Sequence, residues 1–373
     1  MSDEVDVLIA GAGPTGLSAA LFLAERKLRC RIIDKAPAPS TASRAQVLNP
    51  RALELLDRIG IAEELVKEAR PIHAVAFYQG WDRVAKLEFG DVHPRFRMCV
   101  LPQSRTEAML ADALAQRGVR PERRWEIDKF TQDETGVDCV LFDPTRTRQT
   151  FRSSLLFGAD GAHSQVRKTL GVAFIGSDFP EEWPLYDINL HNCPLDPDLA
   201  HVSFVEGGLV FLLCIRNGVW RLFGDVPGLL GRLPPGTRAG EVTWQSAFHI
   251  AHRMAEREVV GRVAIGGDAA HIHSPVAARG MNLGIEDAFV FATCAADALE
   301  GNLNRLADYG RVRQAAHRQV VTEVERLTQL ARGRPSVVGL LRQLFVPFMT
   351  AFPPSARAMK NLVTGLDHDV HVT

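Results

Sequence analysis

One short segment near the N-terminus limits the possible folds of this chain more than any other feature. Three glycines stand between an apolar run at 5–10 and an alanine- and leucine-rich stretch at 17–26: they are Gly11, Gly13 and Gly16. In the pattern G-x-G-x-x-G, the first glycine permits a tight turn, the second lets a pyrophosphate approach the backbone, and the third lets helix and strand pack closely. The segment therefore predicts a strand, a phosphate-binding turn and a helix.

A second predicted strand, 29–34, completes this unit and ends on Asp34. A carboxylate at this place can accept hydrogen bonds from ribose hydroxyls, while the helix N-terminus offers free N–H groups to phosphates. The glycines alone would be weak evidence, because a turn without any ligand can show the same pattern; the complete βαβ unit is much more specific. We therefore expect a dinucleotide to contact the glycines, Asp34 and their neighbours Pro14, Thr15 and Lys35.

Two later glycine-rich segments also follow predicted strands. The first, G-A-D-G-A-H-S, contains Asp160 and Gly161, and the second, G-G-D-A-A-H, contains Asp268. Two more aspartates at strand ends do not fit a simple NAD-dependent dehydrogenase. They favour one extended cofactor that runs along the edge of the sheet.

Length and a change of pattern along the chain indicate more than one domain. The 373 residues exceed the roughly 250–300 residues that one hydrophobic core usually serves. Beyond residue 180, the alternation of strands and helices gives way to strand signals separated by E-G-G and R-N-G turns, as in antiparallel hairpins. The expected parts are a dinucleotide-binding domain (1–71, 99–179 and 256–345), a substrate domain (72–98 and 180–255) and a C-terminal helical tail (346–373).

The three glycine segments, in this order and at these separations, resemble those of the class A flavoprotein monooxygenases, the FAD-dependent aromatic hydroxylases of the p-hydroxybenzoate hydroxylase type. The resemblance extends over residues 4–60, 99–114, 155–171 and 244–300. It implies the α/β class, with a glutathione-reductase-like FAD-binding Rossmann domain, an inserted, mainly antiparallel β-sheet substrate domain and a helical C-terminal segment.

The resemblance also implies an activity. FAD would be the bound cofactor, NAD(P)H a transient co-substrate and O2 the oxidant, and a flavin C4a-hydroperoxide would hydroxylate a small phenolic or heteroaromatic substrate. The protein would position the ring and exclude water, without a nucleophile of its own. Two alternatives stay open: an FAD-dependent reductase of an isoprenoid-like substrate, and a non-catalytic, FAD-stabilised binding protein.

Further residues are assigned to the flavin by the resemblance alone. Arg44 is similar to an arginine that meets the cofactor near the mobile ring, and Gln103 to a residue near the ribityl and phosphate groups. Asp160 is similar to an aspartate that handles the pyrophosphates of FAD and NAD(P)H, and Asp268 to one that bonds the ribityl chain. The backbone N–H groups expected to face the flavin ring belong to Gly280, Met281 and Asn282.

The loop before these residues departs from the family pattern. Pro275 would line the reaction cavity, but the usual P-x-G-G-Q-G is here P-V-A-A-R-G. A positive φ at Ala277 or Ala278 would cost about 1 kcal/mol each. Arg279 replaces a neutral amide, and its cation would favour a negatively charged reduced ring. Arg44, Pro275 and Arg279 are therefore the residues expected at the flavin edge.

The predicted hairpin strands carry candidate substrate contacts. Strand alternation puts Phe211 and Leu213 on one face, with Leu212 and Cys214 on the other. Packing inside the core accounts for most such side chains equally well. The full candidate set is Tyr186, His191, Phe204, Phe211, Leu213, Arg221 and Phe223, together with Pro275.

Composition bears on partners and location. A net charge of −1 gives no footprint for nucleic acid or an anionic membrane, and six cysteines without a C-x-x-C pair suit a reducing cytoplasm. No signal-peptide pattern or membrane-spanning run is visible, so a cytoplasmic protein is expected. His271 and His273 lack an evident third ligand, so no metal site is predicted. The helical C-terminal part is a candidate homodimer contact.

Overall fold

The structure, a computed structural model, describes residues 5–40, 45–333 and 345–372. It begins with the predicted βαβ unit: β1 (Val5–Ala10), α1 (Pro14–Glu25) and β2 (Cys30–Asp34), with β1 and β2 parallel. The last four residues of β1 are buried, so this part of the strand has no solvent face. Val7 and Ile9 pack among the helices, whereas Leu8 and Ala10 pack on the opposite side of the sheet.

β1 lies inside the first of two eight-stranded sheets, whose central order is β17-β18-β11-β1-β2-β8. Strands β18, β11, β1, β2 and β8 are parallel. β10 pairs antiparallel with β11, and β9 pairs antiparallel with β10. α1 packs against α4 and α6. The further elements of this part are β8 (Glu122–Arg123), β9 (Glu126–Gln132), β10 (Val137–Phe142), β11 (Arg148–Gly158), β17 (Val259–Val260), β18 (Val263–Ile265), α4 (Gln103–Gln116), α5 (Gln165–Thr169) and α6 (Gly280–Leu299).

The second sheet has the order β19-β16-β12-β15-β14-β13-β5-β6 and is mainly antiparallel. Its two longest strands, β12 and β16, have 18 residues each and pair with one another over most of their length. The strands are β5 (Ala74–Gln79), β6 (Asp82–Glu88), β12 (Phe174–His191), β13 (Leu199–Val205), β14 (Gly208–Arg216), β15 (Val219–Gly224), β16 (Arg238–Ala255) and β19 (His271–Ile272).

A small third sheet has the order β3-β7-β4. In the sequence, β5 and β6 of the second sheet lie between its strands β4 and β7. The third sheet is accompanied by two short helices, α2 and α3, of which α2 packs against α6. Its elements are β3 (Val47–Leu48), α2 (Pro50–Asp57), α3 (Ala62–Glu68), β4 (Arg70–Ile72) and β7 (Met98–Val100).

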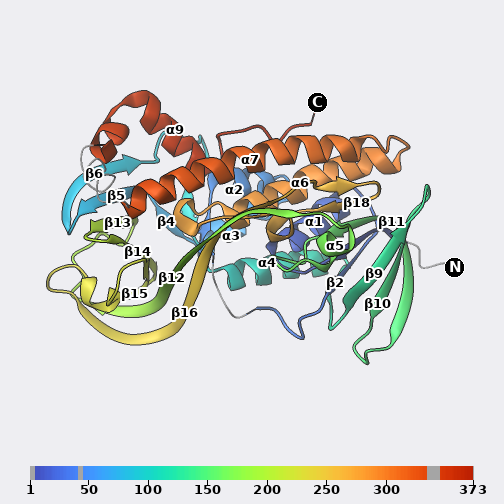
Figure 1. Cartoon of the computed structure of the whole chain (residues 1–373), viewed down its shortest axis with the longest axis horizontal. Coiled ribbons are helices and arrows are strands. Elements are labelled where there is room, and N and C mark those ends of the chain that lie inside the picture. Colours follow the sequence, from blue (N-terminus) through green and yellow to red (C-terminus); the bar gives the residue numbers. More distant parts are fainter. Residues whose placement is uncertain (1–4, 41–44, 334–344, 373) are drawn as a thin grey trace.

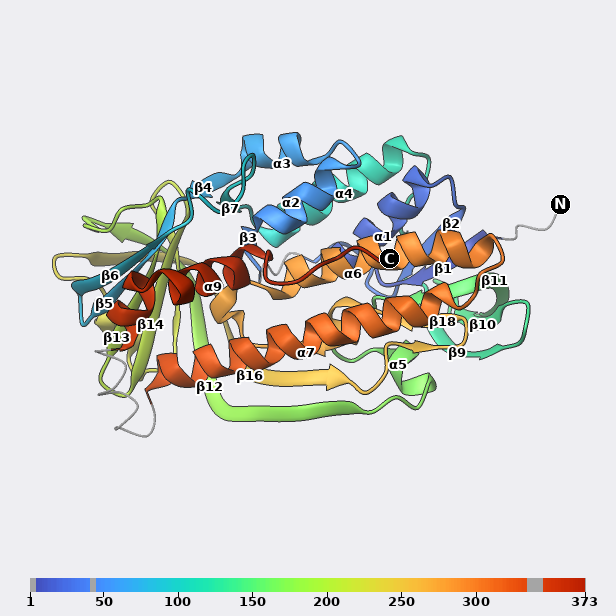
Figure 2. The same cartoon turned by 90° about the horizontal axis from the view of Figure 1, so that it is seen from above.

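Two C-terminal helices connect the parts. α7 (Arg305–Arg332) has 28 residues and runs along much of the molecule, from the end that carries β9 and β10 toward the second sheet (Figure 1). Figure 2 shows α6 and α7 side by side, with α9 (Pro353–Thr364) near β5 and β6. The three-residue 3-10 turns η2 (Gly267–Ala269) and η3 (Pro275–Ala277) precede α6, and η1 (Leu229–Arg232) precedes β16.

The predicted architecture is confirmed: an α/β domain with a parallel core, an inserted antiparallel sheet and a helical C-terminal part. The individual domain boundaries stay predictions. The sequence placed the antiparallel strand signals beyond residue 180, whereas β12 begins at Phe174, and β16 was not predicted as a strand. Among the described helices, none is both long and apolar enough to cross a bilayer.

Candidate active site

A cavity of about 650 Å³ lies between the β1–α1 turn and the second sheet. The glycine turn, the loop before α6 and strands β14 to β16 all contribute to its walls. Arg44 lies outside the described residues, while Pro275 and Arg279 are among the lining residues. The predicted cofactor residues that line it are Gly13, Pro14, Thr15, Gln103, Gly161, Asp268, Gly280 and Met281.

The three glycines of the turn have different neighbours. A Cβ on Gly11, whose φ is +106°, would lie 2.1 Å from the carbonyl oxygen of Ala159, and one on Gly16 would lie 1.9 Å from the carbonyl oxygen of Gly11. Both positions are therefore closed by protein atoms. A Cβ on Gly13 would meet nothing within 4 Å. Because no side chain caps the N-terminus of α1, its N–H groups and this open space form a cradle for an anion.

Asp34 holds this turn in place. Its Oδ2 accepts a hydrogen bond of 2.7 Å from the backbone N–H of Ala12, and its Oδ1 accepts one of 2.7 Å from Ala36. Arg123 lies 3.4 Å from Oδ2. Each carboxylate oxygen can accept a second bond, so the predicted ribose contact is compatible with this geometry. Lys35 beside it is exposed.

The carboxylate of Asp160 is occupied by its own segment. It accepts hydrogen bonds from the backbone N–H of Gln165 (2.6 Å) and of Val166 (3.1 Å), and from the hydroxyl of Ser164. Asp160 therefore stabilises the start of α5. Since the preceding residue, Ala159, contacts Gly11, this segment also fixes the back of the glycine turn.

Gln103 and Asp268 both line the cavity. The side chain of Gln103 accepts a hydrogen bond from the N–H of Ala45 (3.1 Å) and donates one to Glu107 (2.8 Å). Asp268 belongs to η2 and is exposed where it lines the cavity. The preceding Gly267 has a φ of +60°, a left-handed conformation that favours glycine.

A buried ionic cluster supports the segment that carries Asp268. The carboxylate of Asp287 accepts hydrogen bonds of 2.8 Å from the N–H of Gly267 and from His271 Nε2. Its other oxygen accepts bonds of 2.7 Å from Arg313 Nε and His317 Nε2. All four side chains are fully buried. Burial alone would raise the pKa of Asp287, but His317 and Arg313 hold it well below its ordinary value.

His271, Asp287 and His317 place their ligand atoms within 4.8 Å of one another, a spacing that a metal site could share. However, His317 Nδ1 also lies 2.6 Å from Glu258, so both of its ring nitrogens face carboxylates. Such a histidine donates from both nitrogens and is positively charged, and Arg313 brings a second cation to Asp287. We interpret the cluster as an ion-pair network.

This network predicts a stability that falls at alkaline pH. Burial lowers the pKa of His317, but the carboxylates of Asp287 and Glu258 raise it by a larger amount. The resulting pKa is about 9, compared with an ordinary value of 6.5. The stabilisation is fully present below pH 6.5 and is lost as the pH rises through 9; it amounts to at most about 3 kcal/mol. Urea unfolding of the FAD-bound protein across this range measures it. His317→Gln should flatten the profile, whereas His371→Gln, at an exposed position, should not.

The loop before α6 contains the predicted strain at one of its two alanines. Ala278 has a φ of +53°, whereas Ala277 lies in η3 with an ordinary backbone. The side chain of Asn282 holds the loop by donating to Ala278 O (2.8 Å) and Val47 O (2.9 Å) and by accepting from the N–H of Asn49 (3.0 Å). No side chain caps the N-terminus of α6, so its first N–H groups are available to a ligand.

The second sheet contributes an aromatic wall. Phe211 and Phe223 stack with ring centroids 4.5 Å apart. Arg221 donates two hydrogen bonds of 2.8 Å to the carboxylate of Asp187, and its guanidinium lies 5.2 Å from the ring centroid of Trp244. Of the predicted substrate residues, the cavity is lined by Phe211, Leu213, Arg221, Phe223 and Pro275.

The structure places three predicted substrate residues outside this cavity. Tyr186 is directly opposite Leu222 in the sheet, on the other face from Phe223. His191 is exposed at the end of β12, and Phe204 is buried in a stack with Phe77. Lining residues that the sequence reasoning missed include Trp244, Ser246 and Phe248. The alternation of β16, with larger or apolar side chains at every second position, was the signal that could have revealed them.

The family of the chain follows from a comparison with known proteins. A family model described as an FAD binding domain matches residues 4–209 and 234–324, which is most of the chain. The chain belongs to this family. A 6-methylpretetramide 4-monooxygenase of Streptomyces rimosus is 31% identical over 97% of this chain and 68% of its own length. Pentachlorophenol 4-monooxygenase of Sphingobium chlorophenolicum is 30% identical over 77% of this chain and 57% of its own.

Solved structures show the same fold. The anhydrotetracycline hydroxylase OxyS of Streptomyces rimosus superposes with a TM-score of 0.83 at 26% identity, over 98% of this chain and 76% of its own. The p-nitrophenol 4-monooxygenase PnpA of Pseudomonas putida has a TM-score of 0.86 at 19% identity, over 98% and 99% of the two chains. The recognition made from the glycine segments is confirmed: this is an FAD-dependent monooxygenase.

The cavity fits the cofactor of this family. The open space at Gly13 and the uncapped start of α1 suit a pyrophosphate, which needs N–H donors and close backbone approach. The uncapped start of α6 offers a second set of N–H groups further along the same cavity. Both donor sets therefore face one continuous space.

Proposed function

We propose that this cavity holds FAD along its length and that the aromatic wall receives a small aromatic compound for hydroxylation. In this arrangement Gly13, Pro14 and Thr15 bind the pyrophosphate, Gln103 and Asp268 lie near the ribityl chain, and Gly280 and Met281 face the flavin ring. The observation that carries the proposal is that one cavity joins the glycine turn to Phe211, Phe223 and Trp244. Two of the similar proteins are named for phenols, pentachlorophenol and p-nitrophenol, which supports this substrate class.

When bound, FAD supplies the redox chemistry, taking a hydride from NAD(P)H and activating O2 for ring hydroxylation. The protein contributes binding, orientation and exclusion of water. The N-terminus of α6 stabilises negative charge near Gly280 and Met281. The flat faces of Phe211, Phe223 and Trp244 suit an aromatic ring, because stacked aromatic pairs are favourable beyond their buried area.

The guanidinium of Arg221 is a polar group within the aromatic wall. Arg221 is 2% exposed, and its charge is matched by Asp187, so the wall carries no net charge from this pair. A bidentate pair of this kind holds the guanidinium in a fixed orientation. We propose that it favours substrates with a hydroxyl or carbonyl oxygen over wholly apolar ones.

The proposal is tested by reducing the FAD-bound protein with NADH or NADPH in the absence of oxygen. The rate of reduction is measured as bleaching of the flavin, with and without phenols and heteroaromatic compounds. We expect one class of compound to accelerate bleaching and to yield an oxygenated product in air. Phe211→Leu should then raise the KM for that compound about tenfold through lost ring contact. Phe204→Leu, at a position outside the cavity, is the matched control.

The other readings give different outcomes. Rapid bleaching that depends on no aromatic compound, without oxygenated product, would indicate a reductase. FAD bound firmly but reduced by neither nicotinamide would leave the non-catalytic reading and contradict the proposal.

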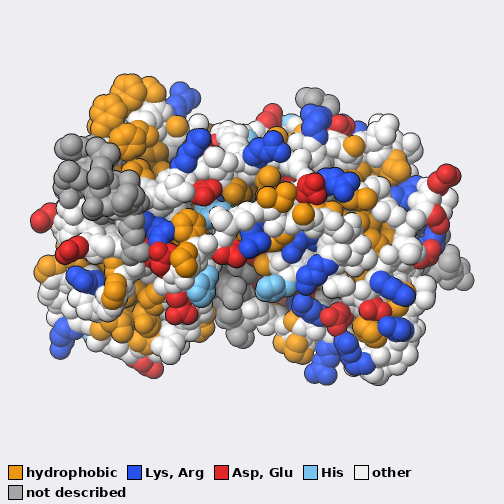
Figure 3. All heavy atoms as spheres, viewed as in Figure 1, with side chains coloured by type: hydrophobic (Ala, Val, Ile, Leu, Met, Phe, Trp, Pro, Cys, Tyr) orange, Lys and Arg blue, Asp and Glu red, His pale blue; other side chains and the backbone are white. Residues whose placement is uncertain are grey.

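Two further predictions concern the surface and location. A homodimer is proposed, with Phe345, Phe348 and Phe352 as exposed apolar side chains in the C-terminal part. Figure 3 shows apolar side chains gathered in that region, while positive and negative side chains are interspersed over the visible face. A cytoplasmic location stays a prediction from the sequence.

A further inference from the structure

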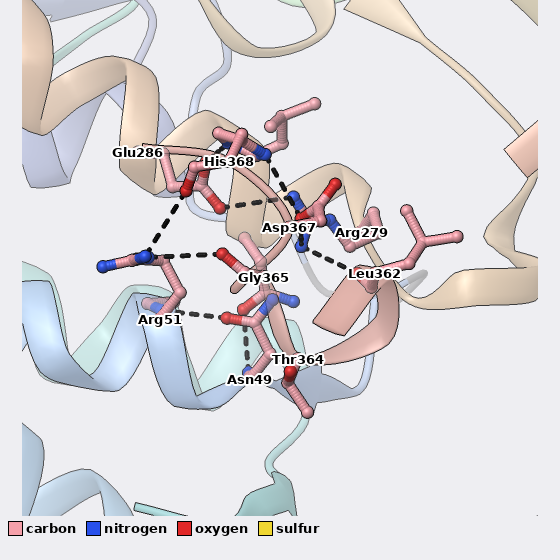
Figure 4. A network of polar contacts seen from close by, with 12 residues as sticks. Asn49, Arg51, Arg279, Glu286, Leu362, Thr364, Gly365, Asp367 and His368 are labelled. Carbon is pink, nitrogen blue, oxygen red and sulfur yellow. Dashed lines mark hydrogen bonds and ion pairs between the residues drawn. The ribbon is translucent and has the colours of Figure 1, made fainter. Parts of the chain in front are cut away.

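Arg279 combines a departure from the family pattern with an unusual environment. It directly precedes α6, and its side chain is fully buried. Its Nη1 donates a hydrogen bond of 2.8 Å to the carbonyl oxygen of Leu362 and lies 3.2 Å from Asp367 Oδ1, while Nη2 lies 3.5 Å from Glu286 Oε1 (Figure 4). A buried cation needs such partners, because removing an unpaired charge from water is costly.

These partners join distant parts of the chain. Glu286 belongs to α6 itself, whereas Leu362 and Asp367 come from the end of α9 and the segment after it. Glu286 Oε2 also lies 2.6 Å from His368 Nε2, so the C-terminal segment is bound to α6 twice. Two carboxylates therefore flank the guanidinium of Arg279 and offset part of its charge, while Glu286 also pairs with Arg313.

The segment 362–368 is held from other sides as well. Arg51 of α2 donates to the carbonyl oxygen of Gly365 (3.2 Å), and Gln319 of α7 donates to that of Asp367 (3.1 Å). Gly365 has a φ of +80°, and a Cβ there would lie 3.0 Å from Arg279 Nη1. A side chain at position 365 would therefore crowd the guanidinium of Arg279.

The loop before α6 is consequently held from two sides. On one side, Asn282 bonds it to Val47 and Asn49. On the other, the left-handed Ala278 belongs to the same apolar cluster as Met359 and Val363 of α9, and Arg279 bonds to the chain just beyond. The uncapped N–H groups of α6 begin at the next residue.

We propose that Arg279 is a positioning residue, which fixes the start of α6 against the flavin by bonding it to the C-terminal segment through Asp367, Glu286 and Leu362. It acts through the backbone of Gly280 and Met281 and not through its own charge, which the two carboxylates offset in part. This inference rests on the proposed placement of the flavin ring. Its consequence is that the C-terminal segment helps to set the potential at which bound FAD is reduced.

The two possible modes of action predict opposite signs. If Arg279 positions the loop, Arg279→Gln and Asp367→Asn both loosen it, and both lower the potential of bound FAD. If Arg279 acts by its charge, Arg279→Gln lowers the potential but Asp367→Asn raises it, because a negative charge is lost. Arg279→Lys separates the two modes again, because lysine keeps the charge but lacks the planar guanidinium that bonds to several partners. The variant should lower the potential if Arg279 positions the loop, and leave it unchanged if Arg279 acts by its charge.

The experiment is equilibrium reduction of the FAD-bound protein against a reference dye, which needs neither substrate nor NAD(P)H. We expect Arg279→Gln, Asp367→Asn and Arg279→Lys each to lower the potential of bound FAD. The expected shift is about 30 mV for two electrons, which corresponds to about a tenfold change in the ratio of the affinities for reduced and oxidised FAD. Asp369→Asn, at an exposed aspartate two residues beyond Asp367, is the control and should leave the potential unchanged.

The possible failures are distinguishable. If the parent protein binds no FAD, the proposed function fails. If FAD binds and Asp367→Asn raises the potential, or Arg279→Lys leaves it unchanged, the positioning role is wrong while the proposed function stands. Should Arg279→Gln not fold, the signs for Asp367→Asn and Arg279→Lys still decide between the two modes.

Discussion

Replacing Gly13 by valine should strongly weaken FAD binding and leave the fold intact. The residue has an extended backbone, with φ −81° and ψ −174°, which any residue can adopt, and an added Cβ would meet no protein atom within 4 Å. The new side chain would fill the cradle in which the N–H groups of α1 meet a pyrophosphate. Loss of two charge-assisted hydrogen bonds corresponds to at least about 3 kcal/mol, or about a hundredfold in affinity.

Gly90→Val is the matched control for this substitution. Gly90 likewise has open space around it and no left-handed φ, and it follows β6, away from the residues that line the cavity. FAD affinity is measured by fluorescence quenching, and folding by circular dichroism. If Gly13→Val binds FAD as tightly as Gly90→Val does, the cradle is not the pyrophosphate site.

Replacing Asp287 by asparagine should cause the largest loss of stability. The amide would leave the buried cations Arg313 and His317 without their shared carboxylate, and breaking such a buried pair costs about 3–5 kcal/mol. Because Asp287 also accepts from the N–H of Gly267, the segment that carries Asp268 should loosen, and FAD affinity should fall with stability.

Glu323→Gln on α7 is the comparison. It removes an ion pair with Arg326 in which both side chains are exposed, and pairs of this kind contribute little. Chemical unfolding with and without FAD gives both quantities. A change in the free energy of unfolding as small for Asp287→Asn as for Glu323→Gln would show that the cluster does not support the fold.

Local patterns carried most of what could be predicted from the sequence. The βαβ unit and the glycine–aspartate segments depend on neighbours within a few residues, so the turn at Gly11 and the strain at Ala278 could be anticipated. The strand β16 was missed because Gly/Pro-rich residues precede it and polar residues interrupt its alternation. The cavity wall at Trp244 was missed with it.

Contacts between distant segments could not be read in this way. Arg279 was expected to act on the flavin by its charge, but its partners Leu362 and Asp367 come from the far end of the chain, and no local pattern indicates them. Asp160 is a different case, because its carboxylate bonds to the start of α5 only five residues further along the chain. In both cases the residue type was noticed, and only the folded chain shows which groups it contacts.

Aromatic hydroxylation at this site is tested most directly with isotopically labelled dioxygen. The FAD-bound protein is supplied with the nicotinamide and the aromatic compound selected by the bleaching experiment, and the product is analysed by mass spectrometry. We expect the product to gain one oxygen atom carrying the label from O2. A product that gains no labelled oxygen, or none at all while the nicotinamide is consumed, would contradict aromatic hydroxylation at this site.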